Sequence, residues 1–138
     1  MINRAIQQIK DQHKLKLAPY TDQDDVLRIG YGKKVNLIEI SPELAQYWLE
    51  LDLESIELDL SDRDFFKHLN VARKAVIINI AYALGLKKLL SFKSFIHSLK
   101  KSDFESAAGC FDRMKLKELM GVGVTRGLSR QLKNGEWK

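Results

Sequence analysis

Several short motifs in the chain contain residue types that do chemistry in other proteins. Gly30-Tyr31-Gly32 resembles the start of a phosphate-binding loop, but it lacks a third glycine and a helix directly after it. We therefore expect a turn at the end of a strand. Gly121-Val122-Gly123-Val124 follows no predicted strand and indicates a joint between two helices. Neither motif predicts a nucleotide site, and we expect no cofactor.

The histidine, cysteine and acidic residues also fail to form a metal-binding pattern. Asp22-Gln23-Asp24-Asp25 resembles the beginning of a calcium loop, but the glycine and the final bidentate glutamate of such a loop are missing. His68 and His97 have no second ligand three or four residues further on. Cys110 is the only cysteine, which excludes an internal disulfide and a multi-cysteine zinc site. We expect no metal and treat Cys110 as a small buried side chain.

The length and composition are those of one soluble globular domain. The chain has 138 residues, of which 45% are hydrophobic and 30% are charged, and this balance argues against disorder. The longest apolar run, residues 75–86, is far shorter than the roughly 20 residues that span a bilayer. The first residues are amphipathic and lack the apolar stretch of a signal peptide. We therefore expect synthesis in the cytoplasm.

Charge is distributed unevenly along the chain. Residues 1–62 carry 7 basic and 12 acidic side chains, a net charge of −5, whereas residues 63–138 carry 16 basic and 6 acidic side chains, a net charge of +10. A basic half favours a polyanionic partner, although a solvated basic surface would look the same. Aromatic residues are not interleaved with the basic ones, so nucleic acid is a less favoured partner than an anionic glycan.

The elements that must position these residues are mostly helices. Ile2, Ile6 and Ile9 recur at helical spacing and predict a helix over residues 2–12. Ser41-Pro42-Glu43 is typical of a helix start, and the apolar face that follows extends to about residue 59. Asn70 can cap the next helix, which is apolar on nearly all sides and ends at Gly85, so it should be the central buried helix. Further helices are expected over residues 91–100, 103–113 and 125–133, with a short helix or break at 61–67.

A small β element is expected between the first two helices. Residues 15–25 predict turn and loop, residues 26–31 a short strand, and residues 35–40 a strand that pairs with it. The predicted fold class is α+β, mostly α, in a single domain with two lobes. The small β lobe covers about residues 13–40, and residues 1–12 and 41–138 form the helical lobe, onto which we expect the first helix to pack.

Three segments, in order, resemble the phage-type lysozymes, the muramidases of tailed phages. Residues 9–22 followed by Ile29-Gly30-Tyr31-Gly32 are similar to the family's first helix, catalytic turn and first strand. Residues 40–45, Ile-Ser-Pro-Glu-Leu-Ala, are similar to the start of its linking helix. The third segment begins at Ala72-Arg73-Lys74-Ala75 and continues to Asn134-Gly135-Glu136-Trp137. The resemblance covers nearly the whole chain and implies a two-lobed fold with a glycan-binding cleft between the lobes.

The resemblance also identifies where catalytic residues should stand. These enzymes cleave between sugars by inversion, using a glutamate as general acid, an aspartate that holds the attacking water, and a nearby threonine. The register places His13 at the glutamate, Asp22 at the aspartate and Arg28 at the threonine, so only Asp22 matches. Among the implied substrate-binding positions, Lys33 replaces a histidine and Ala83 an asparagine or glutamine, and the other two are Tyr20 and Tyr31.

These replacements oppose the family's reaction. Inversion needs a protonated acid and an ionised carboxylate about 6.5–9.5 Å apart, around a transition state that is cationic at the sugar. Arg28 is permanently charged and long enough to pair with Asp22, which would neutralise the carboxylate and displace the water. We therefore expect a lysozyme-like pseudoenzyme that binds or acts on peptidoglycan, with lost or strongly reduced muramidase activity.

Two alternatives remain open from the sequence. The protein could be an active endolysin in which Asp11 or Asp24 serves as a rearranged acid with Asp22. It could also be a phage structural or interaction protein that reuses the scaffold and binds a phage or host protein. The resemblance is compatible with a place in the phage particle or with release to the cell wall.

Overall fold

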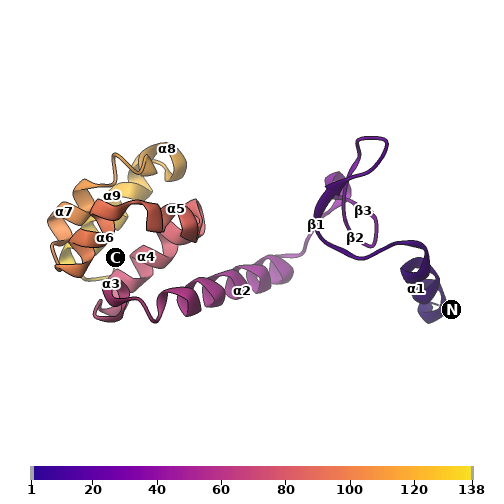
Figure 1. Ribbon diagram of the computed structural model, residues 1–138, viewed down its shortest axis with the longest axis horizontal. Helices are drawn as coiled ribbons and strands as arrows, with labels where there is room; N and C mark the ends of the chain where they lie inside the picture. Colours follow the sequence, from indigo (N-terminus) through magenta and orange to yellow (C-terminus); the bar gives the residue numbers. More distant parts are fainter. Residues whose placement is uncertain (1, 138) are drawn as a thin grey trace. The chain divides into compact units, whose positions relative to one another are not determined.

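The computed structural model describes residues 2–137 and divides the chain into two compact units, Met1–Ala45 and Gln46–Lys138. The first unit contains one helix, a three-stranded antiparallel sheet and a turn of 3-10 helix (Figure 1). In chain order these elements are α1 (Ile2–Gln12), β1 (Lys16–Thr21), β2 (Leu27–Gly30), β3 (Lys33–Lys34) and η1 (Val35–Leu37). We refer to residues 2–45 as the β unit and to residues 46–137 as the helical unit.

The first helix forms where the isoleucine spacing predicts it. Ile2, Ile6 and Ile9 lie on one face of α1, and their side chains are exposed within the β unit. None of the described residues from 2 to 45 is fully buried, as expected for a sheet too small to enclose a core of its own. The packing of α1 on the helical lobe stays a prediction.

The sheet corrects two expectations about the β element. Residues 16–21, predicted as loop, form strand β1, and the partner on the other side of β2 is β3 rather than residues 35–40. The strand order β1-β2-β3 makes β1 an edge strand, and an edge tolerates Pro19 because one row of its backbone groups needs no ladder partner. Gly30 and Gly32 adopt positive φ angles of 68° and 78°, so the chain turns back after β2 sooner than expected.

The helical unit contains eight helices among its described residues, and the first of them begins in the last residues of the β unit. They are α2 (Pro42–Leu60), α3 (Asp64–Lys67), α4 (Val71–Leu84), α5 (Leu86–Ser91), α6 (Lys93–Lys100), α7 (Phe104–Gly109), α8 (Leu116–Met120) and α9 (Val122–Asn134). The unit boundary falls inside the first turns of α2, which starts as predicted with the Ser41 hydroxyl accepting a hydrogen bond from the Leu44 N–H at 3.1 Å.

The core of the helical unit surrounds α4, which confirms the prediction of a central buried helix. Five of its residues are buried, and Val76, Ile77 and Ile80 are inaccessible to solvent. Asn70 caps the helix by accepting a hydrogen bond from the Arg73 N–H at 2.9 Å. Leucines and phenylalanines from α5, α6, α8 and α9 pack around α4, with Phe95 the largest fully buried side chain. This burial supplies the main stabilisation of the unit.

The order of the later helices is as expected, but their boundaries differ. α5 and α8 were not predicted, because each covers fewer than two turns and is too short for a helical period to be recognised. Phe92 has φ −82° and ψ 77°, which interrupts the predicted helix at residues 91–100. Gly121, with φ 89°, is the joint between α8 and α9, whereas Val122, Gly123 and Val124 already belong to α9.

Candidate functional site in the β unit

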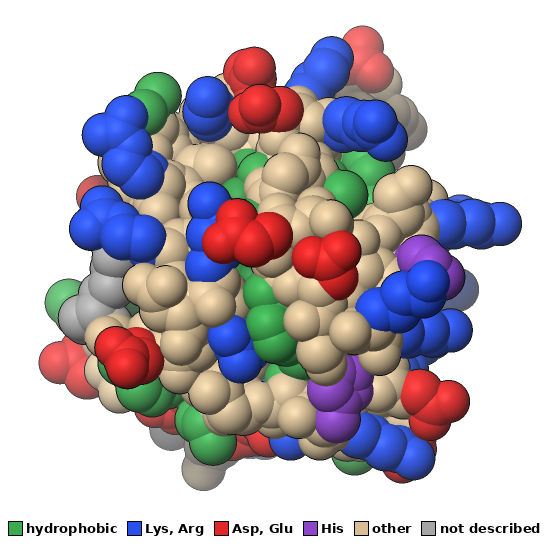
Figure 2. All heavy atoms as spheres, turned by 90° about the vertical axis from the view of Figure 1, so that its left-hand side faces the viewer, with side chains coloured by type: hydrophobic (Ala, Val, Ile, Leu, Met, Phe, Trp, Pro, Cys, Tyr) green, Lys and Arg blue, Asp and Glu red, His purple; other side chains and the backbone are tan. Residues whose placement is uncertain are grey.

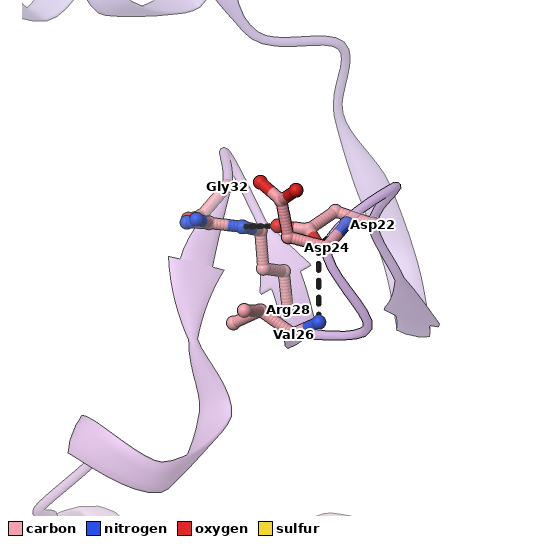
Figure 3. A network of polar contacts seen from close by, with 5 residues as sticks. All are labelled: Asp22, Asp24, Val26, Arg28 and Gly32. Carbon is pink, nitrogen blue, oxygen red and sulfur yellow. Dashed lines mark hydrogen bonds and ion pairs between the residues drawn. The ribbon is translucent and has the colours of Figure 1, made fainter.

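The Asp22 carboxylate holds together the turn between β1 and β2. Its Oδ1 accepts hydrogen bonds from the backbone N–H of Asp24 at 2.8 Å and of Val26 at 3.0 Å (Figure 3). The Asp22 backbone N–H donates to the Val26 carbonyl at 3.0 Å, and Asp25 adopts φ 60°. Aspartate is favoured at such a position because its short side chain can satisfy backbone donors two to four residues ahead. Asp22 therefore organises the turn.

Arg28 occupies the other oxygen of this carboxylate. The Arg28 Nε donates to Asp22 Oδ2 at 2.7 Å, and its Nη1 donates to the Gly32 carbonyl, also at 2.7 Å (Figure 3). The two side chains are only 27% and 20% exposed for Arg28 and Asp22. Arg28 lies in the middle strand, opposite Tyr20 of β1 and Lys34 of β3. The ion pair expected from the sequence is thus present, and the bond from Arg28 to Gly32 also ties it to the turn between β2 and β3.

His13, which follows the end of α1, lies next to the turn between β2 and β3. Its backbone N–H continues the helix by donating to the Ile9 carbonyl at 3.0 Å. Its ring lies against Gly32, so that a Cβ at Gly32 would stand only 2.7 Å from the His13 Nδ1. Gly32 thus lies beside the His13 ring and accepts a hydrogen bond from Arg28 through its carbonyl. His13 and Arg28 therefore meet at this one glycine, and Arg28 links it to Asp22.

The electrostatics of the site keep Asp22 ionised. The hydrogen bond from Arg28, together with those from Val26 and Asp24, holds the pKa of the Asp22 carboxyl below its ordinary value, against a smaller opposing effect of desolvation. An ionised carboxylate can act as a base, but three of its roughly four acceptor positions are used by the turn amides and Arg28. Asp22 has little capacity left to orient a water molecule.

The other predicted site residues are spread over both units. Tyr20 is half-buried in β1, Lys33 is exposed in β3, and Tyr31 is exposed with the Lys10 Nζ 5.6 Å from its ring centroid. Ala83 lies in α4 of the helical unit and is half-buried. Their assignment to substrate binding stays a prediction.

The two acids considered as replacements, Asp11 and Asp24, are both exposed. Asp11 is exposed on α1 and accepts a hydrogen bond from the Gln7 side chain at 2.9 Å. Asp24 is exposed in the turn, where its backbone N–H rather than its carboxylate contacts Asp22. Neither contact places a second carboxylate opposite Asp22.

Sequence reasoning did not identify the backbone partners of the site. The N–H groups of Asp24 and Val26 and the carbonyl of Gly32 complete the network. For Gly32 the residue type itself was a signal, because glycine readily adopts the positive φ angle that this turn requires. The amide partners depend on the course of the turn, for which the sequence carries no comparable mark.

Over residues 2–137, no group of three or more histidine, cysteine, aspartate or glutamate side chains is arranged to hold a metal ion. In the same range, no helix has the length and apolar character needed to cross a membrane.

Comparison with known proteins identifies the family. The model of the family described as phage lysozyme matches residues 10–134. The chain belongs to the phage lysozyme family. The curated proteins contain no significant match. The match covers most of both units, so the mostly helical α+β architecture is that of a phage lysozyme, and a lysozyme-like, peptidoglycan-related function follows from it.

Proposed function

We propose that this phage lysozyme homologue binds peptidoglycan and has lost, or strongly reduced, the muramidase activity of its family. The observation that carries the proposal is the state of Asp22, whose carboxylate is bound by Arg28 and by two turn amides. The family aspartate must hold the water that attacks the sugar. Here three of the roughly four acceptor positions of that carboxylate are already used within the protein.

The remaining positions of the site support the same conclusion. The residue at the place of the general acid is His13, whose ring packs on Gly32. Arg28 adds a permanent positive charge beside the position where the sugar becomes cationic in the transition state. Loss of a general acid alone typically costs about 10²–10⁴-fold in rate, and a fixed cation adds to that cost.

Binding does not require the missing groups. The exposed Tyr31 and Lys33 can contact sugar rings and anionic substituents, and residues 63–138 carry a net charge of +10. A wall glycan that carries carboxylates suits such a surface. Peptidoglycan is therefore the partner that we propose, encountered in the phage particle or after release to the wall.

A direct test compares cleavage with binding. Purified protein is incubated with insoluble peptidoglycan between about pH 4 and 8, released muropeptides are measured, and protein that pellets with the wall is measured separately. We expect pelleting without appreciable release. Turnover like that of an ordinary phage lysozyme would instead support the rearranged acid, Asp11 or Asp24. Absence of both would support a structural protein that reuses the fold.

A gain-of-function variant tests the site assignment. His13→Glu with Arg28→Thr returns the family residues and frees Asp22, so we expect cleavage to rise by at least about tenfold, a modest part of the 10²–10⁴ that general acid catalysis supplies. Lys14→Thr with Lys34→Thr is the matched control, because it also lowers the net charge of the β unit by two. A folded but inert His13→Glu/Arg28→Thr protein would show that the site assignment is wrong.

A further inference from the structure

A surface pocket of the helical unit gathers positive charge away from the β-unit site. The pocket has a volume of about 650 Å³ and lies between α3 and the helices α5 and α6. Its cationic lining consists of Arg63, Lys93 and Lys100, and His97 adds an imidazole. Figure 2 shows Lys and Arg side chains spread over a face of this unit, with histidine side chains beside them.

The spacing along α6 directs three of these groups to one side. Lys93, His97 and Lys100 are separated by four and three residues, so they lie on the same helical face. Lys93 and Lys100 are about 10.5 Å apart along the axis, a span that two flexible lysine stems can close around one ligand. Arg63 faces them from the start of α3.

Arg63 is oriented for binding by a contact with its own chain. Its Nε donates to the Asp59 carbonyl at 3.3 Å, and this bond leaves the two terminal guanidinium nitrogens to act as donors to a ligand. The floor below is apolar, formed by buried Phe65 with half-buried Leu90 and Ile96. An apolar floor strengthens electrostatic attraction at the rim, since it lowers the local dielectric.

The acidic side chains at the rim do not cancel this charge. Asp64 is paired with Lys67 at 3.9 Å, and Lys67 does not line the pocket. The lining itself carries three permanent cations and the two carboxylates Asp62 and Asp64, which gives 3 − 2 = +1, and counting Lys67 beside Asp64 brings the local charge to 4 − 2 = +2. The site therefore suits an anion with at least two negative charges.

We propose that this pocket binds a phosphate-bearing ligand through Arg63, Lys93 and Lys100. Guanidinium groups donate two parallel hydrogen bonds to a phosphate, and lysines bind it as point charges. Such a ligand is chemically distinct from the proposed glycan. The same cations belong to the basic helical unit that we propose to assist glycan binding, but the pocket proposal does not depend on the β-unit site.

The test is an NMR titration of the ¹⁵N-labelled full chain with inorganic pyrophosphate, at an ionic strength held constant with sodium chloride. We expect saturable shifts in the amides of α6 and of Arg63. Lys93→Gln with Lys100→Gln should weaken binding by about tenfold, from the worth of two exposed charge contacts. Arg126→Gln with Arg130→Gln on α9 is the matched control and should bind as the parent protein does.

Three results would overturn the proposal. One is the absence of saturable shifts, and another is equal weakening in both pairs of variants, which indicates a general counter-ion effect. The third is binding of citrate as strong as that of pyrophosphate, which shows that the pocket does not prefer phosphate. None of these results bears on the β-unit site, because the variants leave His13, Asp22 and Arg28 in place.

Discussion

Arg73 joins two helices that are far apart in the sequence, and its removal should destabilise the helical unit. From the first turns of α4, its Nε donates to the Leu132 carbonyl and its Nη2 to the Lys133 carbonyl, each at 2.7 Å. These carbonyls lie in the last turn of α9, where no partner within the helix is available. The positive charge also suits the negative end of the helix dipole.

The magnitude follows from these bonds. A hydrogen bond with a charged donor contributes about 1.5–3 kcal/mol. The bond to Leu132 is partly buried and that to Lys133 is exposed, so we expect Arg73→Met to cost about 2–4 kcal/mol in total. Methionine keeps an apolar stem next to Phe104, whose ring centroid lies 3.7 Å from the guanidinium carbon of Arg73. The measured loss should therefore come mainly from the hydrogen bonds.

The assay is urea denaturation followed by far-UV circular dichroism, which gives the free energy of unfolding by linear extrapolation. Arg73→Lys should fall between the parent and Arg73→Met, because lysine keeps the charge but lacks the planar fork. Arg130→Met is the control, since Arg130 is an exposed arginine on α9. A loss below about 1 kcal/mol in Arg73→Met, or one equal to that of the control, would refute the reasoning.

Three further predictions concern the β-unit site and the core. Arg28→Met should raise the pKa of Asp22 toward its ordinary value, as measured by NMR titration of the carboxyl carbon; an unchanged pKa would remove Arg28 as the main cause of the shift. Because the folded-state pKa of Asp22 is lowered, this group stabilises the fold above its unfolded-state pKa, and the stabilisation is lost as pH falls through the folded-state pKa. Arg28→Met should therefore weaken the dependence of the free energy of unfolding on pH in the acidic range, as measured by denaturation curves. Gly32→Ala should destabilise the fold by at least about 1–2 kcal/mol because of the positive φ angle at this position. Adding His13→Ala should recover the part of the loss that comes from the clash between the new Cβ and the His13 ring, and equal stability of the single and double variants would exclude this clash. Phe95→Ala should cost about 3–5 kcal/mol in urea denaturation because a large aromatic side chain with no solvent exposure is removed, and a loss below about 1 kcal/mol would show that Phe95 is not a core residue.

Much of the helical unit was predictable because its signals are local. The Asn70 cap and the nearly all-apolar composition of α4 are both local features, and the structure contains both. Strand β1 was not predicted because Pro19 and Tyr20 are typical of a turn, and only the pairing with β2 makes residues 16–21 a strand. Strand formation depends on a distant partner, so propensity is a weak guide there.

The sequence by itself determined the residue types at the site. Its resemblance to the family predicts a histidine and an arginine where the family has an acid and a hydroxyl, and the permanent charge of Arg28 follows from its residue type. Only the tertiary structure decided that the Arg28 Nε meets Asp22 Oδ2, that the turn amides take Oδ1, and that His13 rests on Gly32. A side chain's chemistry is a property of its residue, but its hydrogen-bond partners depend on distances that the fold sets, and these distances determine how much of the Asp22 carboxylate remains for a substrate.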